Sequence, residues 1–203
     1  MRPAAARPAG RPRNPELDRA ILAAAEQQLR EAGYAGMSLE SVAAAAGTTV
    51  PAVRRRFRSK ASVAVAVIDS LRFESLPAES GLPRSRALAV LQNFRANLLR
   101  NNSMAVVGTL LAEERRHPEL LAAFRNRLVG PRRAALRRAL AEGISSGELP
   151  EPADPDVLAS MLIGSFYARY IATSDIPDDW AERTLRQVWP DAPQRTAMRP
   201  GPP

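Results

Sequence analysis

Apolar residues recur every three or four positions along most of this chain, which is the spacing of amphipathic helices. A first helix is predicted over residues 15–33, opened by a cap at Asn14 and a first-turn proline at Pro15. Two shorter helices are predicted at 39–46 and 50–57. No segment shows the alternation of a β-strand, so the expected fold class is all-α.

The stretch 38–60, SLESVAAAAGTTVPAVRRRFRSK, has the pattern of a helix-turn-helix. Ser38 is placed to cap the first helix, and Gly47 ends it at a position that favours a left-handed backbone. One of the two threonines that follow is placed to cap the second helix, and Pro51 is tolerated in its first turn. The three predicted helices together form a compact bundle.

The second helix of this pair has an apolar back and a cationic surface. Val50, Val53 and Phe57 line one side, and the run Arg54-Arg55-Arg56 with Arg58 occupies the rest. Such a run is either a solvated helix face or a surface for a polyanion groove. The charge distribution favours a nucleic acid or an anionic membrane, because residues 1–60 carry a net +6 of the total +8.

The remaining chain predicts a larger helical part. Helices are expected over 60–74, 84–101, 103–116, 118–145, 155–173 and 178–188, with a break at 76–85 and a kink at Gly130–Pro131. The expected domains are a disordered basic arm (1–14), a helix-turn-helix domain (15–60), a helical domain (61–189) and a disordered tail (190–203). The arm is either a solvated tail or a source of phosphate contacts.

Several classes of function find no support in the sequence. There are no cysteines, which excludes disulfides, thiolate nucleophiles and cysteine metal sites. His117 is the only histidine, and its place before Pro118 indicates a solvated cap rather than a ligand or base. Since no catalytic or cofactor motif occurs, we expect neither an enzyme nor a cofactor. No apolar run approaches a membrane span and no secretory signal is present, so we expect a cytoplasmic protein without a membrane partner.

The first 67 residues carry a specific resemblance. An N-terminal helix, then GYAGMSLESVAAAAGTTVPAVRRRFRSK, then an all-helical remainder is similar to the TetR/AcrR family of transcriptional regulators. The match runs from about Leu17 to Val67, and the segment LLAEERRHPELLAAFRNRLVGPRRAALRRAL resembles one subgroup's ligand-binding region more loosely. The resemblance implies a helix-turn-helix DNA-binding domain followed by a helical effector-binding and dimerisation domain.

The resemblance also implies which residues meet DNA. The helix 50–57 becomes the recognition helix in the major groove, Lys60 contacts phosphate, and the hydroxyls lie near the backbone. The expected DNA-binding residues are Ser38, Thr48, Thr49, Pro51, Ala52, Arg54, Arg55, Arg56 and Lys60. This chain departs from the family at Arg54 and Arg56, where aromatic residues are usual. Because arginine in the major groove prefers guanine, we expect Arg55 or Arg54 to bind a G.

The C-terminal helices carry two further sets of candidates. Aromatic and aliphatic residues that form core are also able to line an effector cavity: Phe94, Leu98, Met104, Val107, Leu111, Phe124 and Phe166, with Arg95, Asn97 and Asn101 as polar groups. The helix 155–173 is apolar over more than one face. It and the helix 178–189 either complete the monomer's core or, as the family pattern implies, form a four-helix interface between two subunits. The expected interface residues are Leu158, Leu162, Phe166, Tyr170, Leu185 and Val188.

The sequence therefore predicts a homodimeric repressor that binds a near-palindromic DNA operator and is released by a small-molecule effector. Two alternatives remain. The basic end also fits a non-specific nucleic-acid or anionic-membrane binder, and the apolar C-terminal part also fits a helical carrier or enzyme.

Overall fold

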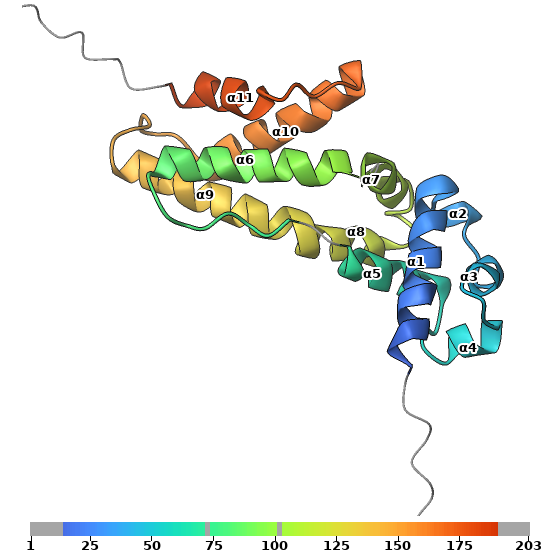
Figure 1. The fold of residues 1–203 in the computed structure, drawn as a ribbon. Coiled ribbons are helices and arrows are strands. Elements are labelled where there is room, and N and C mark those ends of the chain that lie inside the picture. Colours follow the sequence, from blue (N-terminus) through green and yellow to red (C-terminus); the bar gives the residue numbers. More distant parts are fainter. Residues whose placement is uncertain (1–13, 72–73, 101–102, 191–203) are drawn as a thin grey trace, which may run out of the picture. The chain divides into compact units, whose positions relative to one another are not determined.

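The structure is a computed structural model, and it describes residues 14–71, 74–100 and 103–190. Within these residues all regular secondary structure is helical (Figure 1), as the apolar spacing predicts. The predicted arm at 1–14 and tail at 190–203 lie outside the described residues, apart from their innermost positions.

The chain divides into two compact units. The first comprises residues 1–71 with 105–123, and the second comprises 72–104 with 124–203. The predicted domain division at residue 60 stays a prediction, because compactness within one chain does not by itself define domains that fold separately.

The first unit is built around its first helix. It contains α1 (Pro15–Glu31), α2 (Gly33–Gly36), α3 (Leu39–Ala45), α4 (Val50–Arg54) and α5 (Lys60–Ser70). α3 and α5 both pack on α1, and α4 packs on α3 (Figure 1). The spacing that predicted these helices also predicted their buried faces, since Ile21, Val42 and Val53 are fully buried.

The start of α1 forms as its sequence predicts. The side chain of Asn14 accepts a hydrogen bond from the Glu16 amide at 2.9 Å, and Pro15 occupies the first turn. The end differs from expectation, because the chain re-enters helix for one turn as α2 rather than forming a plain connection. This turn follows a left-handed Gly33 (φ +68°) and places Tyr34 in the core.

The second unit is a layered set of long helices. It contains α6 (Pro83–Leu99), α9 (Gly130–Ser145), α10 (Pro155–Thr173) and α11 (Trp180–Val188). α6 packs on α9 and α11, and α10 packs on α9 and α11. Phe94 and Phe166 meet edge to face in its core with ring centroids 5.6 Å apart.

Two shorter helices, α7 (Ser103–Ala112) and α8 (Pro118–Phe124), lie mostly in the first unit's residues. α7 ends at Ala112 rather than at the predicted Arg116, and residues 113–116 form turns before Pro118 starts α8. Just before the predicted kink at Gly130–Pro131 the chain forms a π-helix, η2 (Arg125–Val129), in which the Gly130 amide donates to the Arg125 carbonyl five residues back. Pro131 has no amide hydrogen, so it cannot continue the series of backbone hydrogen bonds of the preceding helix.

Candidate nucleic-acid interface

Local hydrogen bonds fix the turn between α3 and α4. Ser38 and Ser41 form a capping box, in which the Ser41 amide donates to Ser38 Oγ at 3.0 Å and the Ser38 amide donates to Ser41 Oγ at 3.1 Å. Gly47 has φ +62°, and the Thr48 amide donates to the Ala43 carbonyl at 2.9 Å. This closes α3 with a Schellman motif and aims the chain into α4.

The back of α4 belongs to the core of the first unit. Val53 is fully buried, and Ala52 is only 6% exposed, so Ala52 offers almost no surface to a DNA groove. Pro51 and Thr49 are exposed at the start of the helix. Thr49 occupies the cap position without a side-chain cap bond, which leaves its hydroxyl available, whereas Ser38 uses its hydroxyl in the capping box.

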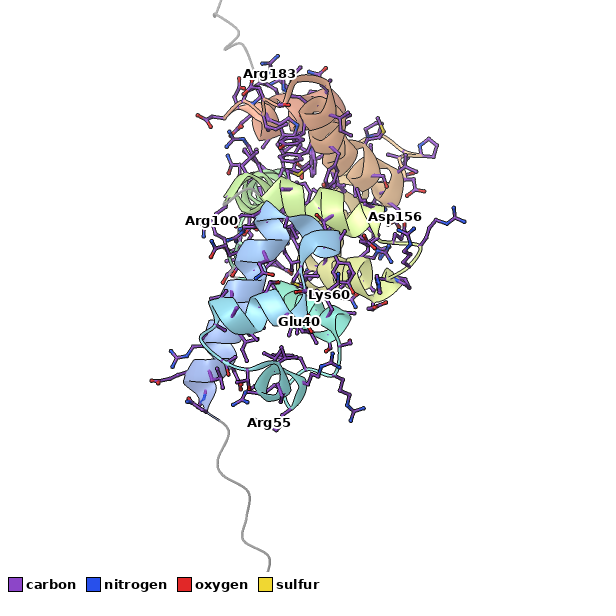
Figure 2. The ribbon with its side chains drawn as sticks, turned by 90° about the vertical axis from the view of Figure 1, so that its right-hand side faces the viewer. Glu40, Arg55, Lys60, Arg100, Asp156 and Arg183 are labelled. Atoms are coloured by element: carbon purple, nitrogen blue, oxygen red, sulfur yellow. The ribbon has the colours of Figure 1, made fainter. Side chains whose placement is uncertain are left out.

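The arginine run separates into two environments. Arg54 and Arg55 are exposed, and Figure 2 shows Arg55 at the outer edge of α4. Arg56 instead forms an ion pair with Asp18 of α1 and donates from Nη1 to the Ala52 carbonyl at 3.2 Å. Its side chain is 15% exposed. Arg56 therefore ties the end of α4 to the start of α1, and Asp18 is a residue that the sequence pattern did not single out.

Lys60 is held by α2. Its Nζ donates to the Tyr34 carbonyl at 2.7 Å and lies 4.2 Å from the centre of the Tyr34 ring. Burial, with smaller contributions from Glu119 and Glu113, raises the pKa of the Tyr34 phenol, so the ring stays neutral at physiological pH. A phosphate near Lys60 would share an ammonium group that is already engaged by the protein.

The predicted effector-lining residues are mostly packed core. Phe94, Leu98, Phe124 and Phe166 are buried in the second unit. On α7, Val107 is buried, Met104 is half-buried and Leu111 is 55% exposed. The open groove between α10 and α11 lies elsewhere, and none of the seven lines it.

The polar groups predicted beside that cavity have other partners. Asn97 is buried and binds backbone within the second unit, where its amide donates to the Asn93 carbonyl at 2.7 Å. Arg95 pairs with Asp178 at 2.6 Å and donates to the Ile176 carbonyl. Asn101 lies outside the described residues.

The residues predicted for the dimer interface differ in how far the protein itself buries them. Phe166 and Leu185 are fully buried and Leu162 is nearly so, while Leu158, Tyr170 and Val188 are half-buried. The exposed apolar stripe is Val157 (54%), Met161 (57%) and Ile171 (83%). The helix has two apolar stripes, and packing buries Leu162 and Phe166 of the predicted set while Leu158 and Tyr170 stay partly accessible beside the exposed stripe.

An open groove accompanies this stripe. It has a volume of about 500 Å³ and lies between α10 and α11. Its lining residues are Met161, Leu162, Ser165, Arg169, Pro177, Trp180, Arg183, Thr184, Gln187 and Val188. Met161 belongs to both the groove and the exposed stripe, so the two form one continuous surface.

The described part of the chain contains no cluster of three or more side chains suited to hold a metal ion. The His117 ring packs edge-on against the Tyr34 ring, with ring centroids 4.7 Å apart. Its Nδ1 lies 3.3 Å from Glu119 Oε1. No helix among the described residues is long and apolar enough to cross a membrane.

Two family models match the chain. Residues 21–67 match the model described as bacterial regulatory proteins of the tetR family, and residues 77–188 match the tetracyclin repressor-like C-terminal domain. The chain is 26% identical to the uncharacterized HTH-type transcriptional regulator YdeS of Bacillus subtilis, over 87% of this chain and 89% of that protein. It is 28% identical to the uncharacterized regulator Mb1581 of Mycobacterium bovis, with coverages of 82% and 80%.

Solved structures show the same fold. A TetR/AcrR regulator from Thermobifida fusca aligns with a TM-score of 0.62 at 28% identity, covering 86% of this chain and 97% of that one. The fatty acid degradation regulator FadR from Bacillus halodurans aligns with a TM-score of 0.65 at 19% identity, covering 88% and 96%. The chain thus belongs to the TetR family of transcriptional regulators, a non-enzymatic family, and binds DNA through its helix-turn-helix.

Proposed function

We propose that this chain is a ligand-responsive repressor that binds a near-palindromic operator as a homodimer and releases it when a small-molecule effector binds. Residues 15–60 form the DNA-binding part, and residues 61–189 form the effector-binding and dimerisation part. A regulator of chromosomal genes acts in the cytoplasm.

The observation that carries the DNA-binding role is the exposed edge of α4. Arg54 and Arg55 project from a helix whose start is fixed by the Gly47 turn and whose end is tied through Arg56 to α1. Guanidinium groups on a fixed helix have the geometry for base edges, because they form two parallel hydrogen bonds to a guanine. Thr49 and Arg58, both exposed, are suited to phosphate.

The exposed stripe and groove of α10 and α11 support a dimer. Three large apolar side chains exposed on one side of a helix, beside a groove, are typical of an interaction site. Two copies related by a two-fold axis would cover Met161 with its own equivalent, which is how a self-complementary interface forms. We therefore assign the interface to Val157, Met161 and Ile171 in addition to the half-buried Leu158, Tyr170 and Val188.

The effector site is proposed within the second unit's aromatic core. Phe94, Phe166 and Tyr167 contact one another edge to face, with centroid distances of 5.6–6.0 Å. An apolar organic molecule that enters this core must displace packed rings. Its binding therefore favours a second conformation, and the shift in population lowers DNA affinity.

Duplex titration with and without unrelated competitor DNA tests specific binding. We expect a duplex selected from a random pool to resist competitor, since specific and non-specific binding usually differ by about 10³–10⁷. The matched variants are Arg55→Ala and Arg137→Ala, the latter an exposed arginine of α9. Equal loss of affinity in both variants, or full competition at every salt concentration, would contradict the proposal.

A further inference from the structure

Lys60 is the single lysine of a chain whose other cationic side chains, apart from His117, are arginines. It is the first residue of α5 and is half-buried, whereas Arg58, two positions earlier, is exposed. The family pattern implies a phosphate contact for Lys60. The groups that surround its ammonium within the first unit indicate a different role.

The ammonium group lies at the end of the short helix α2. Carbonyl groups in the last turn of a helix have no partner within that helix, and a lysine can donate hydrogen bonds to them. Lys60 Nζ donates to the Tyr34 carbonyl at 2.7 Å and lies 3.5 Å from the Ala35 carbonyl oxygen. The same nitrogen lies 4.2 Å from the centre of the Tyr34 ring. An ammonium has three N–H donors, and two carbonyl oxygens and the face of a ring surround this one.

Tyr34 is fixed within the core of the first unit. It is 4% exposed, and its ring packs against the His117 ring as well as facing the Lys60 ammonium. Its backbone carbonyl is therefore an acceptor in a well-packed part of the unit. A hydrogen bond of this kind holds Lys60 more firmly than a contact between two mobile surface side chains.

The end of α2 is also the approach to the helix-turn-helix. The Met37 amide donates to the Gly33 carbonyl at 3.2 Å, and Met37 is 1% exposed. Ser38 follows and caps α3. Since Met37 alone separates α2 from that cap, the place where α2 ends determines where α3 begins, and α4 packs on α3.

We propose that Lys60 is a positioning residue of the DNA-binding unit. Its ammonium caps the end of α2 and thereby fixes the start of α3, instead of contacting phosphate. Phosphate is left to exposed groups such as Arg58. This inference rests on DNA binding through the helix-turn-helix and requires neither the dimer nor the effector.

Hydrogen exchange tests the capping role. Lys60→Met keeps the apolar stem and removes the ammonium. We expect its Met37 amide to exchange at least about tenfold faster than in the unmodified chain, while amides in the middle of α1 keep their rates. Arg58→Met is the matched control, because it removes an exposed cation two residues away and should leave Met37 exchange unchanged.

Two results of this experiment would overturn the capping role. One is unchanged Met37 exchange in folded Lys60→Met. The other is equal acceleration throughout the first unit, which a merely structural role would produce. Circular dichroism establishes that the variant is folded, and Lys60→Gln, which also removes the charge, is the second variant if Lys60→Met unfolds.

The salt dependence of DNA binding tests the absence of a phosphate contact. The probe is a duplex selected from a random pool, titrated over a range of salt concentrations. Loss of one phosphate contact reduces the slope of log affinity against log salt concentration by about 0.9. We expect Lys60→Met and Lys60→Gln to keep the slope of the unmodified chain and to bind at least about threefold more weakly at every salt concentration, because α3 is less firmly placed. A slope reduced by about 0.9 or more in these variants, or an unchanged affinity, would overturn the inference.

Discussion

Neighbouring arginines in one run have different physical roles in this protein. Arg54 and Arg55 face solvent, whereas Arg56 is drawn back toward Asp18 across 38 residues of sequence. Members of the family usually have an aromatic residue at positions 54 and 56. In this chain Arg54 is an exposed cation, and Arg56 pairs with Asp18 within the protein. Only the free arginines have guanidinium groups available for base edges.

The consequence for Arg55 is a change in sequence preference. We expect Arg55→Ala to lose about 1–3 kcal/mol of the binding free energy that distinguishes guanine from other bases at one operator position, because one bidentate contact to guanine disappears. The measurement is a binding isotherm on a panel of single-substitution operators. Arg56→Ala serves as comparison, and it should weaken binding to all panel members alike because it loosens α4. A uniform loss for Arg55→Ala would mean that Arg55 contacts only phosphate.

The role of a residue could be predicted from the sequence when its partner lies close to it along the chain. Asn14, Ser38 and Gly47 act on neighbours within five residues, and their capping roles are confirmed. The Arg56–Asp18 pair and the Lys60–Tyr34 contact span 38 and 26 residues. No local pattern reports such pairs, because tertiary packing decides which cation meets which acceptor.

At the level of elements, helical spacing predicted the helices but not every boundary or face. The start of the helix predicted at 155–173 is confirmed, because the Asp154 side chain caps it and Pro155 lies in its first turn, and both features are local. α2 was missed because four residues are too few for periodicity. Which apolar residues of α10 stay exposed could not be predicted, since two apolar stripes on one helix look equivalent until their neighbours are known.

The exposed stripe of α10 predicts the effect of a charge there. We expect Met161→Glu to raise the dimer dissociation constant at least about 30-fold, because two carboxylates would be brought together in a desolvated interface. Sedimentation equilibrium measures this constant. Leu111→Glu is the matched control, since Leu111 is 55% exposed against 57% for Met161 but lies on α7. Equal dissociation of both variants, or of neither, would place the interface elsewhere.

At the scale of the whole molecule, the protein exposes two surfaces with different chemistry. The first unit exposes cations on α4, and the second exposes an apolar stripe beside a groove. A single copy of the protein has one recognition helix. The proposed two-fold pair would have two, and it would bind a site whose halves are inverted copies of each other.

Selection of binding sites from a random duplex pool tests this claim most directly. The account predicts an enriched motif with two-fold symmetry, a guanine in each half-site, and half-site centres about one helical turn or a multiple of it apart. The same selection with Met161→Glu should return single half-sites at lower enrichment. An enriched motif without symmetry, or no enrichment at any salt concentration, would contradict the account.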